Sequence, residues 1–541
     1  MTVKRLNELF QDGVPFAIGE HDLEAIEGEA PHSDRGNGQD KKDVPEFDAG
    51  CQDLPLLCGL TWDAIGLRNN PAVLFRYGGE PCRIEYDDEG APFPRPLTED
   101  RLLHEVARAV RWYKTVKVKD GHERRPAFPT RTLIRDMKAT PGIPLPVLLG
   151  IIESPIIAQD ESFHNTPGYS LTTGLFYAPA KGFHVPPVPL FPSTEDIARA
   201  REIIICELLG DFPFTGEAEL AHAVALLVLP FARNLIEGPT PLTLIEKPTP
   251  GTGASLLATV LTFPFTGRIQ AATTEGRDED EWRKRITAKL RHGAGVFYID
   301  NLRRRLESAT VSAFLTATVW EDRILGTSDN IRLPVRCVCV ATGNNPSLSD
   351  EITRRTVRVR LDARQDRPWQ RTGFRHPNLF EWASANRADI VWAALTFIRA
   401  WLAEGKTGSQ SAPVLGMFEE WSRIMGGILD VAGIPGFLGN LAAFYDTSDT
   451  EGADARAFLS AWREEHYDSP VGVADLWAIA SAPNCTLNLG DKGERSQKIR
   501  LGKMLSQLRD RHYRLDDGAT VCVKAAGQNK GVAKWRLKGS G

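Results

Sequence analysis

The segment that most constrains the fold runs from Leu242 to Leu257, where an apolar strand, a turn rich in Pro and Gly, and a helix start follow one another. The same alternation continues over residues 241–361, with apolar strands separated by amphipathic helices. Strands that are apolar throughout are buried on both faces, so this pattern predicts a mainly parallel sheet covered by helices on both sides. We therefore expect an α/β fold centred on this region.

The turn within this segment has the chemistry of a phosphate-binding loop. Glycines let backbone N–H groups converge on phosphates, and the helix that follows adds the positive end of its dipole. Against the pattern G-x-x-x-x-G-K-[ST], Gly253 and Ser255 fit, whereas Ala254 stands at the lysine position and Glu246-Lys247-Pro248 replaces the first glycine. By itself the motif also fits an ordinary strand–turn–helix connection. The candidate nucleotide-binding residues are Lys247, Pro250, Gly251, Thr252, Gly253, Ala254, Ser255 and Leu256.

Polar residues then follow two further apolar strands. Asp300 and Asn301 end the strand that starts at residue 295, in a position suited to holding Mg²⁺ through water. Asn344 ends the strand that starts at residue 337, and Arg354 and Arg355 precede the strand over 357–361. Taken singly, these residues also fit a helix cap, ordinary turn chemistry and a solvated basic face.

In this order and at these spacings, the loop, Asp300, Asn344 and the arginine pair resemble AAA+ ATPases. The resemblance is to the superfamily III-like helicase modules of phage, virus and mobile-element replication proteins, often fused to primases, and covers about residues 195–405. It implies ATP and Mg²⁺ as cofactors, Mg²⁺ held by Ser255 and Asp300, and Asn344 as a sensor that positions the attacking water. It also implies that Arg354 or Arg355 is an arginine finger acting on a neighbour's nucleotide. A ring-forming homo-oligomer, usually a hexamer, follows from the family.

Two departures from the family pattern bear on activity. Ala254 removes the cation that meets the β- and γ-phosphates, and losing one partner of such a charge pair costs about 2–5 kcal/mol. Lys247, seven residues earlier, is a candidate substitute. Asn301 stands where many AAA+ proteins have a glutamate that polarises water. Two functions therefore stay open: an ATP-dependent DNA helicase of a phage or mobile element, or a catalytically degenerate paralogue that binds DNA or a partner as an adaptor.

DNA is the expected macromolecular partner because basic charge gathers near the C-terminus. Residues 491–541 hold 13 Lys and Arg against 5 Asp and Glu. A basic helix with Ile499, Leu501, Leu505 and Leu508 on its apolar face, followed by two short strands, predicts a winged-helix-like domain. The alternative is a packed accessory helix with a solvated basic face. The candidate DNA-binding residues are Lys498, Arg500, Lys503, Arg509, Arg511 and Arg514, together with Arg323 and Arg332, which flank the position of the family's pore hairpin. The tip of that hairpin, residues 326–330, has no Lys, Arg or His.

A chain of 541 residues exceeds one hydrophobic core, so several domains are expected. Residues 1–50 read as a disordered acidic segment and 51–190 as a mixed α/β domain with a helix over residues 99–114. Residues 191–405 form the expected AAA+ domain with a helical lead-in and lid, and 413–541 the basic C-terminal domain. The eight scattered cysteines include no C-x-x-C pair, which argues against a zinc ribbon. The sequence shows neither a signal-peptide apolar region nor a membrane span, so we expect a cytoplasmic protein with no membrane partner.

Overall fold

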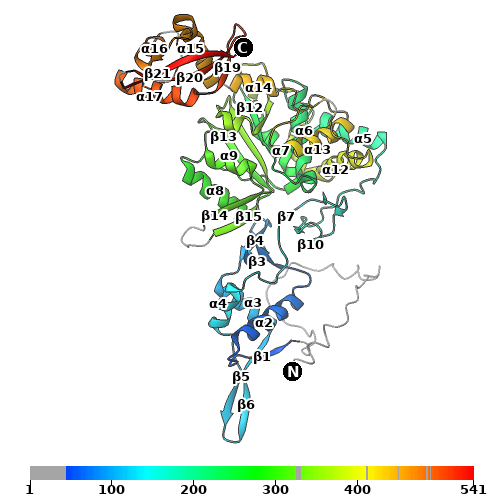
Figure 1. Cartoon of the computed structure of the whole chain (residues 1–541). Coiled ribbons are helices and arrows are strands. Elements are labelled where there is room, and N and C mark those ends of the chain that lie inside the picture. Colours follow the sequence, from blue (N-terminus) through cyan, green and yellow to red (C-terminus); the bar gives the residue numbers. More distant parts are fainter. Residues whose placement is uncertain are drawn as a thin grey trace.

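The computed structural model describes residues 44–540, apart from 324–329, 410–411, 449, 483–484, 486, 488, 491 and 530. Residues 1–43 of the segment expected to be disordered lie outside the described residues, as do residues 326–329 of the expected hairpin tip. Figure 1 shows a central body around a sheet, with a smaller N-terminal group of elements at one end and a C-terminal group at the other.

The central sheet has four parallel strands. They are β12 (Leu242–Lys247), β13 (Val296–Leu302), β16 (Val338–Asn344) and β17 (Thr356–Arg360), in the order β13-β16-β12-β17. A single parallel bridge between Thr273 and Ile299 extends the pairing beyond β13. The expected mixed α/β fold with a parallel sheet is therefore confirmed, and its strands are those that the apolar runs predict.

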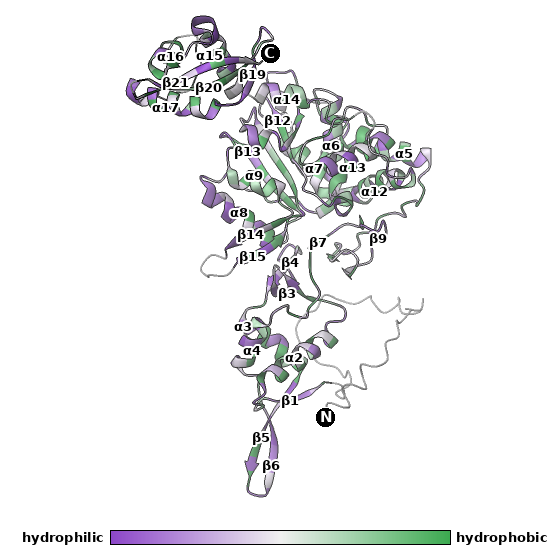
Figure 2. Cartoon of the chain, in the orientation of Figure 1, coloured by the Kyte–Doolittle hydropathy of each residue, from purple (hydrophilic) through white to green (hydrophobic). Residues whose placement is uncertain are grey.

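Helices cover both faces of this sheet because side chains alternate along each strand. Ile245 points into a core formed with helices of one face, whereas Leu244 points into a second core on the other. Hydrophobic residues predominate in α6 and α7, and hydrophilic residues along α8 (Figure 2). The first face carries α5 (Thr194–Arg201), the π-helix η2 (Glu202–Leu208), α6 (Glu217–Ala232), α7 (Ala254–Thr266), α11 (Leu379–Ala385), α12 (Arg387–Ala403) and α13 (Glu419–Val431). The second carries α8 (Glu279–Arg291), α9 (Ala309–Thr316) and the hairpin β14 (Val319–Arg323) and β15 (Asn330–Pro334).

One helix in the described part of the chain, Glu217–Leu235, is long and apolar enough to cross a membrane by length and composition. It comprises α6 and the 3-10 turn η3 (Arg233–Leu235), and 83% of its apolar window is buried inside the protein. Ala221, Val224 and Val228 lie fully buried in the first core. These contacts assign the helix a place in the core beside the sheet.

The N-terminal elements form two small sheets and three helices. The antiparallel sheet β2-β3-β4 packs with the second core, whereas β1-β5-β6 lies at the far end. Trp62, Leu102 and Leu133 join the three helices in a core of their own. The helix expected over residues 99–114 ends at Ala109, and a strand begins at Arg111. The elements are β1 (Glu46–Asp48), α2 (Leu54–Arg68), β2 (Leu74–Tyr77), β3 (Glu80–Tyr86), β4 (Pro92–Pro96), α3 (Glu99–Ala109), β5 (Arg111–Val118), β6 (Gly121–Pro126) and α4 (Arg131–Ala139).

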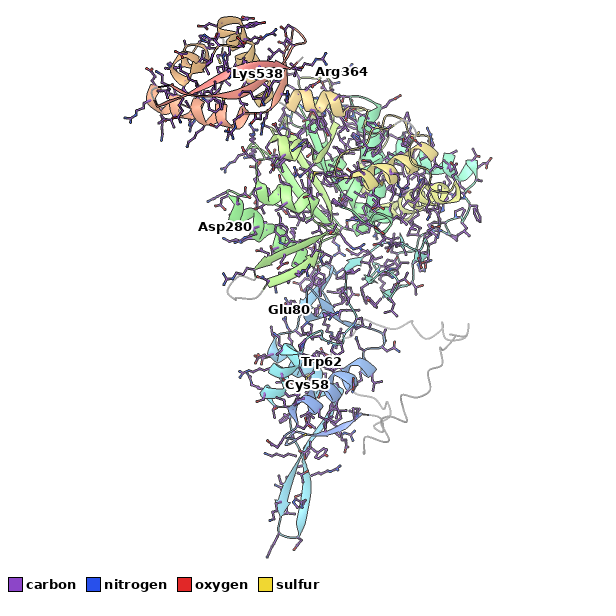
Figure 3. All side chains as sticks on the ribbon, viewed as in Figure 1. Cys58, Trp62, Glu80, Asp280, Arg364 and Lys538 are labelled. Carbon is purple, nitrogen blue, oxygen red and sulfur yellow. The ribbon has the colours of Figure 1, made fainter. Side chains whose placement is uncertain are left out.

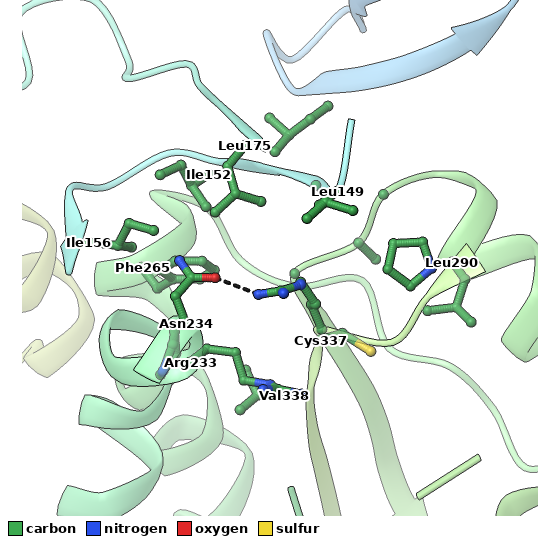
Figure 4. Close-up of a pocket in the computed structure, with 18 of the residues that line it drawn as sticks. Leu149, Ile152, Ile156, Leu175, Arg233, Asn234, Phe265, Leu290, Cys337 and Val338 are labelled. Carbon is green, nitrogen blue, oxygen red and sulfur yellow. Dashed lines mark hydrogen bonds between the residues drawn. The ribbon is translucent and has the colours of Figure 1, made fainter. Parts of the chain in front are cut away.

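A run of five short strands then packs on the amino edge of the central sheet. They are β7 (Gly150–Ile152), β8 (Ile156–Ile157), β9 (Phe163–His164), β10 (Gly168–Ser170) and β11 (Leu175–Tyr177). Between this run and the sheet lies a cavity of about 50 Å³ (Figure 4). Arg233, in its wall, donates to the carbonyls of Ile236 (2.7 Å) and Gly238 (3.1 Å). Arg336 donates to Asn234 and lines the same cavity.

The C-terminal elements pack three helices on an antiparallel sheet of order β18-β21-β20-β19. Leu501, Leu505 and Leu508 of α17 are buried against Trp462 and Trp535. Ile499 is 57% exposed and does not belong to that face, contrary to expectation. The elements are α15 (Thr450–His466), β18 (Val471–Gly472), α16 (Val473–Ala480), α17 (Glu494–Leu508), β19 (His512–Arg514), β20 (Thr520–Asn529) and β21 (Val532–Ser540). The preceding helix, α14 (Leu441–Ser448), packs with the central body, since its Phe444 lies in the second core.

Candidate functional site

The Pro/Gly-rich turn follows the carboxyl end of β12 and opens α7. Gly251 and Gly253 have φ angles of 83° and 104°, a left-handed region that glycine adopts without steric cost. No side chain caps the N-terminus of α7. The amide groups of Gly251 to Gly253 donate to no other described residue. The loop therefore presents free N–H donors beside a helix N-terminus, which is an arrangement that binds anions.

Ser255 and Asp300 meet directly at this loop. The Ser255 hydroxyl, in the first turn of α7, donates to Asp300 Oδ1 at 3.0 Å. The hydroxyls of Tyr298 and Thr342 donate to the same oxygen, at 2.8 and 2.5 Å. Thr342 in turn accepts from the backbone N–H of Asn301 at 2.8 Å. The strand-end carboxylate is thus held in one orientation by three hydroxyl groups.

Sequence analysis did not single out Tyr298 and Thr342. Each lies two residues before a strand-end candidate, Tyr298 before Asp300 and Thr342 before Asn344. Side chains two apart on a strand share one face, so strand alternation is the signal that would have found them.

The carboxylate of Asp300 and the amine of Lys247 influence each other's pKa at this edge of the sheet. Burial raises the pKa of Asp300, but hydrogen bonds from Thr342, Tyr298 and Ser255 and the charge of Lys247 outweigh it and lower the pKa below its usual value. Burial lowers the pKa of Lys247, and the charge of Asp300 partly offsets this. Lys247 ends β12 and is only 9% exposed. The side chain is therefore enclosed beside the loop rather than extended into solvent.

A polar cavity of about 430 Å³ adjoins Asp300 at the same edge of the sheet. Asn301, which has a positive φ of 59°, and Asn344 both line it. Its wall also includes the arginine run 303–305, which sequence analysis did not select. The structure thus brings Lys247, Ser255, Asp300, Asn301 and Asn344 to one edge.

Two aromatic side chains approach the glycines of the loop. A Cβ atom at Gly251 would lie 3.1 Å from Cβ of Trp369, and one at Gly253 would lie 3.4 Å from Cε1 of Phe212. Trp369 belongs to the short helix η4 (Pro368–Gln370) and is 60% exposed. Both residues come from segments outside the strand–turn–helix, so the motif gave no signal for them.

Glu246, at the position where the motif departs from the pattern, has a structural role. Its buried carboxylate pairs with Arg360, and Arg358 lies 3.7 Å away. Arg360 also donates to Asn345 Oδ1 at 3.2 Å. This network ties β12 to β17 and to the turn after β16.

Arg354 and Arg355 lie at the opposite edge of the sheet from the loop. The Arg355 carbonyl accepts from the N–H of Leu242, the first residue of β12, at 2.9 Å. Lys247 ends that strand about 16 Å away. The Arg355 guanidinium donates to the Glu351 carbonyl of α10 (Asp350–Thr353) at 2.6 Å, whereas Arg354 is exposed. The structure does not bring this pair to the nucleotide loop of its own chain.

The candidate DNA-binding residues lie on two separate elements. In the β14–β15 hairpin, Arg323 lies across from Asn330 and Arg332 across from Glu321, which is 3.5 Å away. On α17, Arg500 and Lys503 are exposed, whereas Lys498 pairs with Glu494.

The remaining candidates follow α17 in the chain. Arg509 is 3.6 Å from Asp510 just past the end of the helix. Arg511 lies in the turn that follows, and Arg514 ends β19. Arg511 and Arg514 are therefore not on the helix face that the basic run predicts.

No protein-family model matches the sequence, and no curated protein matches it. Among solved structures, the chain is similar to the apo form of the NrS-1 C-terminal region, with a TM-score of 0.37 and 10% identity over 78% of this chain and 94% of that one. It is also similar to the active helicase SCCmec type IV Cch, with a TM-score of 0.34 and 12% identity over 85% of this chain and 91% of that one.

Proposed function

We propose that the protein is an AAA+ nucleotide-binding protein that couples hydrolysis of Mg-ATP to movement on DNA, as a replication helicase of a phage or mobile element does. The observation that carries the proposal is the contact between the Ser255 hydroxyl and the Asp300 carboxylate, 3.0 Å apart, beside a loop with free amides. P-loop NTPases bind Mg²⁺ and phosphate where a carboxylate at the end of a strand contacts the first turn of a helix that follows a glycine-rich loop.

The donor set fits both cofactors. Hydroxyl and carboxylate oxygens are the ligands that Mg²⁺ prefers, and Mg²⁺ usually keeps several waters, so one Ser and one Asp suffice. The described residues include no cluster of three or more His, Cys, Asp or Glu that suggests a different metal. When bound, Mg²⁺ supplies neutralisation of charge on the phosphates. The loop amides and Lys247 would hold the phosphates, and Trp369 and Phe212 offer apolar surface to the base.

The strand order supports a role for Asn344. Because β16 lies between β12 and β13, Asn344 ends its strand between the loop and Asp300. A neutral amide there orients an attacking water by hydrogen bonds. Asn301, in the wall of the same cavity, contributes a second amide.

A ring-shaped homo-oligomer, such as a hexamer, completes the proposed site. Arg354 lies exposed at the opposite edge of the sheet, so it reaches a nucleotide only across an interface between subunits. In this arrangement Arg354 of one subunit stabilises charge at the phosphates bound by the next.

DNA contacts are assigned to α17 and to the β14–β15 hairpin. The order α15, β18, α16, α17 and then the hairpin β20–β21 is compatible with a winged helix, whose last helix enters the major groove. Three side chains of α17 face solvent: Arg500, Lys503 and Ile499. The two basic side chains suit contacts to phosphates, and the apolar Ile499 suits contact with thymine methyl groups. We place this activity in the cytoplasm.

A second function is favoured by one observation. Ala254, at the position of the usual lysine, is 1% exposed and carries no charge. A protein with such a loop would bind nucleotide weakly and act as a DNA- or partner-binding adaptor in place of a motor.

DNA-stimulated ATP hydrolysis by the purified chain separates these functions. We expect hydrolysis in the parent and none in Asp300→Ala, because that carboxylate serves the metal rather than packing. Asp280→Ala, an exposed acid on α8, is the matched control and should behave as the parent. Circular dichroism checks that both variants fold. Unchanged turnover in Asp300→Ala would remove the metal assignment, and a parent that binds but does not hydrolyse ATP would favour the adaptor.

A further inference from the structure

The hairpin formed by β5 and β6 projects from the N-terminal end of the molecule as a two-stranded ribbon (Figure 1). The third strand of its sheet, β1, pairs with β5 only over Arg111 to Tyr113. Beyond that point the ribbon continues to Val118, a reach of about 17 Å. Near its base, Thr115 donates to Asp48 at 3.0 Å and Arg124 lies 3.7 Å from Glu46, whereas the outer end of the ribbon stands clear of other elements (Figure 3) and every residue of β6 is exposed. The ribbon therefore adds no core to the protein.

Basic charge is concentrated on this ribbon. Residues 111–126 carry six Lys and Arg against two Asp and Glu, whereas the rest of residues 44–149 carries nine against 13. An otherwise acidic unit thus holds a basic arm. Charges that only protect an edge strand from aggregation need not be of one sign.

The register places basic side chains directly opposite one another. Lys114 lies across from Arg125, and Lys117 across from His122, on opposite faces of the ribbon. Like charges in directly opposed cross-strand positions destabilise a sheet. None of Lys114, Lys117 and Lys119 has an ion pair with another described residue. Arg125 is paired with Glu123 at 3.0 Å, so the charge on the ribbon that an anion would neutralise is chiefly that of the three lysines.

Aromatic residues accompany these charges at the base of the ribbon. The Arg124 guanidinium lies over the ring of Tyr113, 4.4 Å from its centroid. Phe128, two residues after β6, is 85% exposed. Basic side chains interleaved with exposed aromatic rings suit a nucleic acid better than an acidic protein surface.

We propose that the β5–β6 ribbon is a duplex-DNA-binding arm that enters the major groove. Two strands about 5 Å apart fit a groove about 12 Å wide, with basic side chains available to phosphates on both walls. The arm is separate from the nucleotide site, from α17 and from the β14–β15 hairpin. It acts without nucleotide.

The test is binding of the full-length chain to a fluorescent duplex by anisotropy, without nucleotide, over a series of salt concentrations. We expect Lys114→Gln/Lys117→Gln/Lys119→Gln to weaken binding several-fold and to reduce the slope of log affinity against log salt by roughly 2 to 3, since each lost phosphate contact removes about 0.9. The Arg triple at these three positions keeps the charge and should keep the parent slope. Arg131→Gln/Arg135→Gln/Lys138→Gln on α4 removes equal charge from the same unit and serves as the control.

Three comparisons make the outcome decisive. A slope for the Gln triple equal to that of the α4 control would overturn the proposal. Groove entry also requires that the loss be absent on duplex RNA, whose major groove is too deep and narrow, and on single strands; an equal loss on either contradicts it. We expect the Gln triple to weaken DNA binding by the same factor in the Asp300→Ala background, so the result does not depend on ATP hydrolysis. Thermal unfolding confirms that the exposed substitutions leave the fold intact.

Discussion

At the scale of single residues, Lys247 is a positive side chain beside the nucleotide loop that could act in place of the missing lysine at Ala254. Its charge lowers the pKa of Asp300, and its side chain is enclosed at the end of β12. An ammonium is a point charge that needs no bidentate geometry, so it can serve phosphates from a displaced position. We therefore propose Lys247 as the substitute cation.

The corresponding prediction compares ATP binding by isothermal titration. Lys247→Met keeps the apolar stem and removes the charge, and we expect it to lose at least an order of magnitude in affinity, roughly 1.4 kcal/mol. Ala254→Lys should tighten binding only modestly, because one cation is already present. Lys284→Met, an exposed lysine on α8, is the control. If Lys247→Met binds as the parent does while Ala254→Lys gains affinity and hydrolysis, Lys247 has no role and the loop is a degraded one.

The sequence predicted those site residues that a local pattern marks. Ser255 and Asp300 were found because a turn and a strand end flag them, and the structure brings them within 3.0 Å. Trp369 and Phe212 were missed because their approach to the loop depends on long-range packing that no spacing reveals. The buried Glu246 is a third case, since its partner Arg360, which is half-buried, lies on a strand far along the chain.

At the scale of elements, the central strands were predictable because each is apolar throughout and bounded by turn residues. The helix over residues 99–114 was extended too far because Val110 and Trp112 continue the helical spacing. From Val110 onward the sequence also alternates and contains β-branched and aromatic residues, and pairing with β1 and β6 decides in favour of a strand. The basic ribbon was missed for the same reason.

Helix α17 carries both packing and basic side chains. Its buried leucines hold it to the domain, so truncating residues 491–541 would remove half of a core and not only a DNA contact. Point substitution avoids this. Arg500→Gln/Lys503→Gln should reduce the salt slope of DNA binding by roughly 2 units while the melting temperature stays unchanged.

Matched loss of charge on α4, in Arg131→Gln/Arg135→Gln, is the control for this measurement. A slope equal to that of the control would mean that the basic face of α17 is merely solvated. Ile499 offers an independent check, because an exposed aliphatic side chain on a groove-facing helix contributes to base preference and not to salt dependence. Ile499→Ala should therefore change the preferred sequence while it keeps the slope.

At the scale of the whole molecule, apolar packing joins segments that lie far apart in the chain. The first core takes Ile152 and Tyr177 from before α5, and Met425 and Phe437 from after α12, into one cluster with Val340. Pro/Gly-rich segments predict where a chain bends, but burial decides which segments share a core. The expected domain limits near residues 190 and 405–413 stay predictions.

The arrangement of Arg354 gives a prediction about assembly. It is exposed at the amino edge of the sheet, and the length of β12, about 16 Å, separates that edge from the loop at the carboxyl edge, so a finger role requires a second subunit. Arg354→Ala has an intact metal site but no finger, whereas Asp300→Ala has an intact finger but no metal site. We expect each variant to be inactive alone. Mixing them should restore part of the ATP hydrolysis at those interfaces where Asp300 of one subunit faces Arg354 of the other, and the recovery should rise with protein concentration.

Arg108→Ala, an exposed arginine on α3, is the control and should keep the parent activity. Full activity of Arg354→Ala alone, or a mixture that stays inactive at every concentration, would contradict action between subunits.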